Sequence, residues 1–428
     1  MNKIIPKIFV FVLAFSFASA ATFAQSGFDL SNINSDDIHS VGVPDLSLPE
    51  PAPAEDKTGS SLKPLPKKEW TIMAFINAKN DLEKFGIEDV NEMEKVGSSS
   101  RVNIVVEFGR MRGHSSADGD WTGARRLYIR KDNNSSKVTS PIVQNLGKIN
   151  MGDWREVIKF VKWAKAKYPA RRYMLIIWNH GSGWLEGNPV RETGKGISYD
   201  DETGNNIDTP QLALVLARVG NIDIYASDAC LMQMASVVYE IGSSVDYIIG
   251  SEEVEPGRGY SYDKFLAKLK SNPSMSSLEL AKEVVNSYVS FFSGNTQSVI
   301  NTKKTRYLPK FTNDFVDAVM KAGEKNVAKV ARDSAEKYNF EDNKDMYNFV
   351  ELVVGSTKSK NVRKKGELLM TFLDKFLIAY NKRGVFSRSS HGLAVYLPEE
   401  FFYSYTYRKL KWADDTKWDE FIEWLLKK

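Results

Sequence analysis

The chain of 428 residues contains one cysteine, Cys230, and 4 histidines. A thiol attacks a carbonyl carbon efficiently only as a thiolate, and a neighbouring imidazole or a helix N-terminus is what lowers its pKa enough. A cysteine without such neighbours is usually a small buried hydrophobe. The residues around Cys230 must therefore decide between packing and chemistry.

Cys230 and His180 each follow closely after an apolar run that predicts a buried strand. The run 172–178 leads into NHGSGW, which contains His180, and the run 222–226 leads into SDACLM, which contains Cys230. Parallel strands bring their carboxyl ends to one edge of a sheet, so we expect the imidazole and the thiol to meet there. Their separation of about 50 residues is the one found in caspases, although the caspase signature around the cysteine is absent.

In such a pair the thiol is the nucleophile and the imidazole protonates the leaving amine. The backbone N–H groups of Gly181 and Cys230 are expected to form the oxyanion hole. A helix predicted over 231–241 would place its positive dipole end near the thiol. His391, just before a late apolar run, is the only other histidine that competes with His180.

A rival interpretation buries Cys230 and uses Ser182 or Ser227 as the nucleophile. Neither serine lies in the G-x-S-x-G turn that presents the nucleophile of α/β hydrolases. The sequence therefore favours the thiol over either hydroxyl.

The N-terminus predicts export. Basic residues precede the apolar run 8–18, and the small residues at 18–20 offer a cleavage site, with Ala24 as a second candidate. The run is shorter than the roughly 20 residues of a membrane-spanning helix. We expect residues 1–24 to be a signal peptide and the protein to be periplasmic or extracellular in a bacterium.

Residues 25–68 are rich in proline, serine and aspartate and predict a linker or pro-segment without a core. In residues 69–261 apolar runs alternate with helical patterns, which predicts an α/β core with a mainly parallel sheet flanked by helices. Residues 262–428 predict a mostly helical C-terminal region that packs on this core. The net charge is only +4 and no basic stripe is present, which argues against a nucleic-acid partner.

Two of these segments resemble signature blocks of the clostripain family. They are NHGSGW at 179–184 and DACLM at 228–232, while SEEVEPG at 251–257 and GLAVYLP at 392–398 resemble two weaker blocks. The likeness extends from about Trp70 to the C-terminus. It implies the fold of the caspase, gingipain and legumain clan and a cysteine endopeptidase that cuts after a basic residue.

The resemblance also implies roles for single residues. His180 and Cys230 become the catalytic dyad, and Asp228 reads the basic side chain of the substrate. Arginine would be preferred over lysine because its planar fork pairs with a carboxylate through two hydrogen bonds. The alternative for Asp228 is an N-cap of the helix expected after Cys230.

The polar loop 188–196 lies between the two catalytic residues and contains Arg191 and Lys195. The resemblance implies that the enzyme activates itself by cutting this loop, with Lys195–Gly196 as the preferred bond. The product would be a processed complex of two fragments, or else a monomer with a plain surface loop at 188–196.

No cofactor is required by this chemistry. Some relatives depend on calcium, and Asp200, Asp201 and Glu202 would be the candidate ligands because calcium prefers oxygen donors. Their spacing fits no dedicated calcium loop, so we assign no metal site. A catalytically silent relative that binds peptides at the same sheet edge is the alternative from another class of function.

Overall fold

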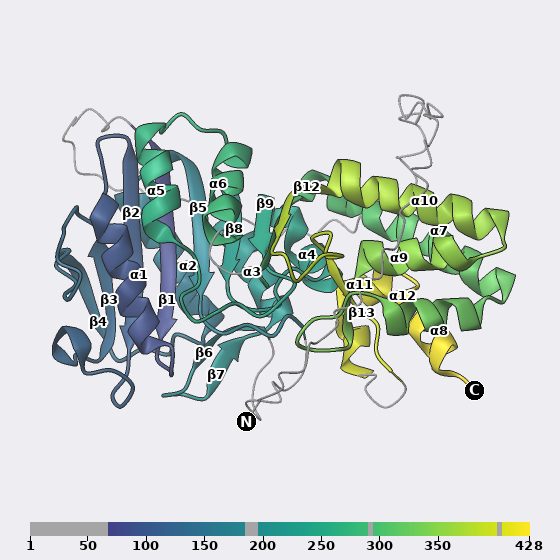
Figure 1. Ribbon diagram of the computed structural model, residues 1–428. Coiled ribbons are helices and arrows are strands. Elements are labelled where there is room, and N and C mark those ends of the chain that lie inside the picture. Colours follow the sequence, from purple (N-terminus) through teal and green to yellow (C-terminus); the bar gives the residue numbers. More distant parts are fainter. Residues whose placement is uncertain (1–66, 185–195, 290–293, 400–404) are drawn as a thin grey trace, which may run out of the picture. The chain divides into compact units, whose positions relative to one another are not determined.

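The computed structural model describes residues 67–184, 196–289, 294–399 and 405–428. Within these ranges nine strands form one sheet in the order β12-β10-β9-β8-β5-β1-β2-β3-β4 (Figure 1). The strands from β9 to β2 run parallel, and the outer strands on both sides are antiparallel. Their bounds are β12 Ile378–Arg383, β10 Thr296–Asn301, β9 Val245–Gly250, β8 Ile222–Asp228, β5 Ala170–Trp178, β1 Lys68–Ala78, β2 Val102–Arg110, β3 Gly123–Tyr128 and β4 Ile142–Gly147.

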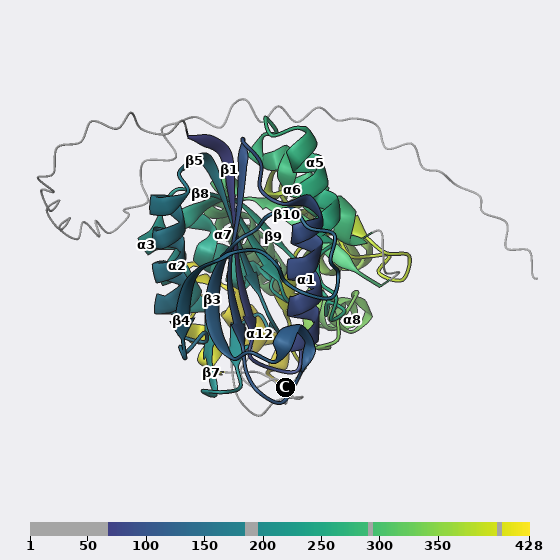
Figure 2. The same cartoon turned by 90° about the vertical axis from the view of Figure 1, so that its left-hand side faces the viewer.

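Helices cover both faces of this sheet, as the continuous apolar runs predict. Side chains of β1 alternate between two buried clusters: Met73 and Phe75 belong to one, and Ile72 and Ala74 to the other. Figure 2 shows the sheet between the two layers of helices. The first layer contains α2 Trp154–Lys167, α3 Thr209–Val219 and α4 Ala235–Ile241, and the second contains α1 Glu83–Val96, α5 Tyr262–Ser271 and α6 Ser277–Val289.

The C-terminal region is not only helical. Its strands β10 and β12 continue the central sheet beyond β9, so the sheet extends past residue 261. Two short strands, β11 Asn343–Asp345 and β13 Ala394–Tyr396, form a separate pair. The helices of this region are α7 Leu308–Ala322, α8 Lys325–Ser334, α9 Met346–Ser356, α10 Lys360–Phe372, α11 Lys411–Asp415 and α12 Trp418–Leu426.

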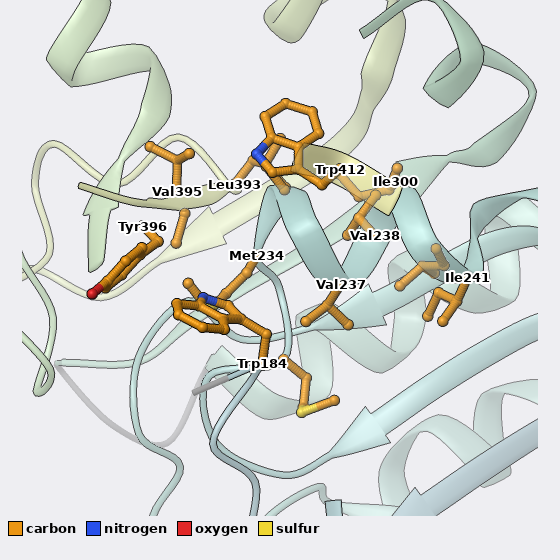
Figure 3. Packing of buried hydrophobic residues seen from close by; sticks show 14 of the residues in the cluster. Trp184, Met234, Val237, Val238, Ile241, Ile300, Leu393, Val395, Tyr396 and Trp412 are labelled. Carbon is orange, nitrogen blue, oxygen red and sulfur yellow. The ribbon is translucent and has the colours of Figure 1, made fainter. Parts of the chain in front are cut away.

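Aromatic packing joins this region to the loop that follows β5. The Trp184 ring lies 4.6 Å from the rings of both Tyr396 and Tyr407, centroid to centroid. Figure 3 shows Trp184 beside Met234, which pairs with Ala394 through an isolated bridge. The C-terminal region therefore supports one of the two loops predicted to carry chemistry.

Among the described residues, no helix combines the length and apolar character needed to cross a membrane.

Candidate active site

Neighbouring parallel strands position the two predicted catalytic residues. Trp178 of β5 is in register with Asp228 of β8, and Asn179 N–H donates to the Asp228 carbonyl at 3.2 Å. His180 and Cys230 each follow two residues later. The backbones pack so closely here that a Cβ atom on Gly181 would collide with the Cys230 carbonyl oxygen. Only glycine permits this approach, which confirms that the two loops meet at one sheet edge.

A segment between β9 and α5 covers the Cys230 thiol. The N–H of Glu255 donates to Sγ at 3.2 Å, and Sγ lies 3.8 Å from the Glu255 carbonyl oxygen. Burial raises the pKa of Cys230 to about 12, although the backbone N–H groups of Glu255, Cys230 and Gly181 act in the opposite direction. Cys230 is half-buried, and this environment favours the protonated thiol.

His180 is held by its own loop and by a carboxylate. The side-chain oxygen of Asn179 accepts from His180 N–H at 2.6 Å and from Tyr199 N–H at 2.9 Å. The imidazole Nε2 lies 2.8 Å from Oδ1 of Asp81, which follows β1 at the same edge of the sheet. The sequence interpretation missed Asp81 and Asn179. A signal existed for Asp81, because it lies shortly after a third apolar run, residues 70–76.

The expected helix over 231–241 begins late. Leu231 has a φ of 61°, and α4 starts only at Ala235 and has 7 residues. The intervening chain pairs with another segment instead: Leu231 N–H donates to the Glu253 carbonyl and Gln233 N–H to the Ser251 carbonyl. The prediction of a helix dipole acting on the thiol was therefore wrong.

The alternative role of Asp228 as a helix cap was wrong as well, since no helix starts beside it. Its buried carboxyl accepts from Tyr260 N–H at 3.1 Å and from the Tyr262 hydroxyl at 2.8 Å. Burial raises the pKa of Asp228 to about 7. Burial and the neighbouring Asp228 carboxyl raise the pKa of Glu255 well above its usual value.

These two acids lie in a buried, acceptor-rich cluster with Gln297. The Oε1 atom of Gln297 is buried without a hydrogen-bond partner, and the carboxyls of Glu255 and Asp228 share a hydrogen bond. In the described part of the chain, no lysine or arginine forms an ion pair with Asp228 or Glu255. Buried acids are costly when ionised, and a hydrogen bond between the Glu255 and Asp228 carboxyls lowers that cost.

The competing residues are engaged elsewhere. Ser182 is buried and its hydroxyl lies 2.8 Å from that of Tyr199, while the buried Ser227 hydroxyl donates to Tyr225 at 2.9 Å. His391 packs in the C-terminal region, with Nδ1 3.2 Å from Oδ1 of Asp345 and its ring stacked on Tyr347. The two serine hydroxyls are thus bonded to tyrosines, and the His391 ring is held by Asp345 and Tyr347.

Of the predicted processing sites, Arg191 and Lys195 lie outside the described residues. Gly196 is described and has a φ of 97°, which favours glycine. Its N–H donates to the Ser182 hydroxyl at 3.1 Å, and its carbonyl accepts from Ser182 N–H at 2.9 Å. The residue after the preferred bond is therefore anchored to the loop that carries His180.

Two of the three acids considered as calcium ligands are paired with a lysine. The buried Lys79 ammonium lies 3.6 Å from Asp200 and 2.8 Å from Glu202. Asp200 also accepts from the backbone N–H of Met151 at 2.8 Å. Within the described ranges, no group of three or more His, Cys, Asp or Glu side chains could hold a metal ion.

Comparison with known proteins gives consistent matches. The sequence model of the clostripain family matches residues 74–424. Clostripain from Hathewaya histolytica is 30% identical over an alignment of 226 residues, and this match covers 47% of this chain and 42% of that protein. The chain thus aligns with less than half of the length of this relative.

Solved structures match over more of the chain. A secreted C11 cysteine protease from Bacteroides thetaiotaomicron, in complex with an irreversible peptide inhibitor, has a TM-score of 0.61 at 20% identity and covers 82% of this chain and 100% of its own. An inactive zymogen C11 protease from Parabacteroides distasonis has a TM-score of 0.61 at 16% identity and covers 82% of this chain and 98% of its own. These likenesses support the same caspase-like α/β fold.

Proposed function

Because the chain belongs to the clostripain family of cysteine peptidases, we propose that it is an exported endopeptidase that cuts after arginine and, less readily, after lysine. The observation that carries the proposal is the close packing of the His180 loop on the Cys230 backbone at the carboxyl ends of β5 and β8. Protein or peptide substrates with a basic residue before the cut bond are its partners. Export rests on residues 1–24, which lie outside the described residues.

In the proposed mechanism, His180 takes the proton of the Cys230 thiol, and the resulting thiolate attacks the carbonyl carbon of the peptide bond. The N–H groups of Gly181 and Cys230, which already act on the thiol, stabilise the negative oxygen that forms. His180 gives a proton to the leaving amine, and a thioester remains on Cys230. Water then attacks the thioester, His180 takes up the proton, and the acid product leaves.

Substrate selection rests on the acceptor-rich cluster of Asp228, Glu255 and Gln297. Asp228 lies two residues before the nucleophile, and its carboxyl faces the Tyr260–Tyr262 segment together with Glu255. A guanidinium that reaches this cluster would donate to Asp228 and to the buried oxygens of Glu255 and Gln297. The positive charge of the guanidinium would also favour ionisation of Asp228 and Glu255, which burial otherwise opposes.

An alkylating peptide tests the activity directly. A peptide that carries a reactive group after arginine should label Cys230 at a rate at least 100-fold above the same peptide with citrulline, which keeps the shape but lacks the charge. Mass spectrometry locates the label, and Cys230 is the only thiol in the chain. Equal slow labelling by both peptides, with no hydrolysis of an arginine reporter, would instead support a catalytically silent relative.

The contact of Glu255 with the Cys230 thiol supports activation by processing, since a rearrangement of this segment would free the thiol for substrate. We expect the wild type to be cut after Lys195, or after Arg191, and to run as two fragments under denaturing conditions. Gly196 keeps the new N-terminus anchored to Ser182, so the fragments should remain associated without denaturant. The Cys230→Ala protein should remain one chain.

N-terminal sequencing of both fragments identifies the signal cleavage site and the internal cut. A Lys195→Gln/Arg191→Gln double variant provides the control, because it should stay uncut while its thiol remains intact. If Cys230→Ala is cut like the wild type, another protease performs the processing. If the uncut double variant is fully active, cleavage is not an activation step.

A further inference from the structure

Asp81 lies in the loop between β1 and α1, and β1 is the parallel neighbour of β5 in the sheet. Its Oδ1 atom is 2.8 Å from Nε2 of His180, although the two residues are 99 positions apart in the sequence. We propose that Asp81 is a positioning residue that fixes the orientation and the tautomer of the His180 ring. This inference rests on the proposed role of His180.

The chemistry of the contact assigns the protons. An ionised carboxylate only accepts hydrogen bonds, so the ring nitrogen that faces it must carry the hydrogen. The neutral imidazole then has its hydrogen on Nε2, and Nδ1 is the nitrogen that exchanges a proton with the Cys230 thiol and the leaving amine. When His180 becomes an imidazolium during the reaction, the Asp81 charge stabilises it.

The surrounding loops are built to hold this contact. Asn80 is buried, and its side chain accepts from Leu82 N–H at 3.0 Å and donates to the Tyr199 carbonyl at 2.9 Å. Asn179, on the other side, donates to the same carbonyl at 3.1 Å and accepts from Tyr199 N–H. The two asparagines next to Asp81 and His180 are thus joined through one backbone residue.

The Asp81 side chain is 59% exposed, so solvent weakens its charge interaction with the imidazole. We therefore expect a smaller contribution than that of a buried triad aspartate. Replacement by asparagine keeps the shape but allows either the oxygen or the amide hydrogens to face Nε2, which releases the tautomer. Such a change affects the proton-transfer step more than substrate binding.

The kinetic test compares Asp81→Asn with Asp120→Asn, which removes an exposed carboxylate from the loop after β2. Both are measured on an arginine reporter, with enzyme concentration set by titration with the alkylating peptide so that processing differences do not enter. Asp81→Asn should lower kcat about 10- to 100-fold with KM unchanged within about twofold. Asp120→Asn should match the wild type. A kcat within twofold of wild type for both Asp81→Asn and Asp81→Ala would overturn the inference.

A second measurement does not depend on turnover. Ring ¹⁵N spectra of the Cys230→Ala protein contain signals from only 4 histidines, and the His180 signals are identified by their loss in the Cys230→Ala/His180→Ala protein. The Nε2–H form should dominate, and Asp81→Asn should produce a mixture of tautomers. A dominant Nδ1–H form would overturn the inference. If His180→Ala keeps full activity, the proposed dyad fails; if His180→Ala is inactive and Asp81→Asn is not impaired, only the role of Asp81 fails.

Discussion

Cys230→Ala is expected to abolish hydrolysis of an arginine reporter peptide, with a loss on the order of 10⁴-fold or more. No other thiol exists in the chain, and the nearby Ser182 and Ser227 hydroxyls are buried in contacts with tyrosines. His180→Ala should cause a comparable loss, because nucleophile and base act as a unit. Each variant is first cleaved by tagged wild-type enzyme, which is then removed by its tag. Progress curves on the reporter then measure catalysis without the effect of failed processing.

His391→Ala is the matched control for the imidazole. Its ring is engaged with Asp345 and Tyr347 in the C-terminal region, so the variant should lose some stability but keep its turnover once folded. Thermal unfolding of each variant verifies the fold. Activity near wild type in Cys230→Ala would disprove the cysteine mechanism. An inactive His391→Ala beside an active His180→Ala would show that His180 is not the base.

Asp228→Asn should reduce the preference for arginine over citrulline by about 10²- to 10³-fold, since a lost charge partner costs about 3 to 4 kcal/mol. The amide oxygen of the new asparagine can still accept from Tyr260 N–H, so the surrounding side chains should keep their arrangement. Asp223→Asn is the control, because it makes the same change at the opposite end of β8, where the carboxyl accepts from Tyr173 N–H. The ratio of kcat/KM for the two reporters is the measured quantity. An unchanged ratio in Asp228→Asn would remove Asp228 from substrate selection.

The same residue predicts a pH dependence of binding. Burial raises the pKa of Asp228 to about 7, so the carboxyl is increasingly protonated below that pH and then cannot pair with a guanidinium. Binding of an arginine-terminated peptide to the Cys230→Ala protein, measured by calorimetry, should weaken from pH 8 to pH 6. The Asp228→Asn protein should lose most of this pH dependence. The remainder would come from the neighbouring Glu255, whose pKa is also raised.

Folding stability has the opposite dependence on this group. The folded pKa lies above the unfolded value, so the folded state binds more protons between about pH 4 and pH 7. The contribution of Asp228 to stability is therefore greatest at acidic pH and declines as the pH rises through 7. The cluster therefore keeps two buried acids that reduce stability at neutral pH.

The sequence by itself determined the alternation of strands and helices in the core and the strand-end positions of His180 and Cys230. Buried parallel strands appear as continuous apolar runs, which is why β5 and β8 could be recognised. These features depend on local patterns and on general rules for parallel sheets.

Only the tertiary structure decided what surrounds the dyad. The predicted helix after Cys230 gave way to a turn, because residues 231–233 hydrogen-bond to 251–253 rather than to their own neighbours. The contact of Glu255 with the Cys230 thiol joins residues that are 25 positions apart, and the contact of Asp81 with His180 joins residues that are 99 positions apart. No local pattern specifies such contacts, since they arise when the ends of strands that are neighbours in the sheet are brought to one edge.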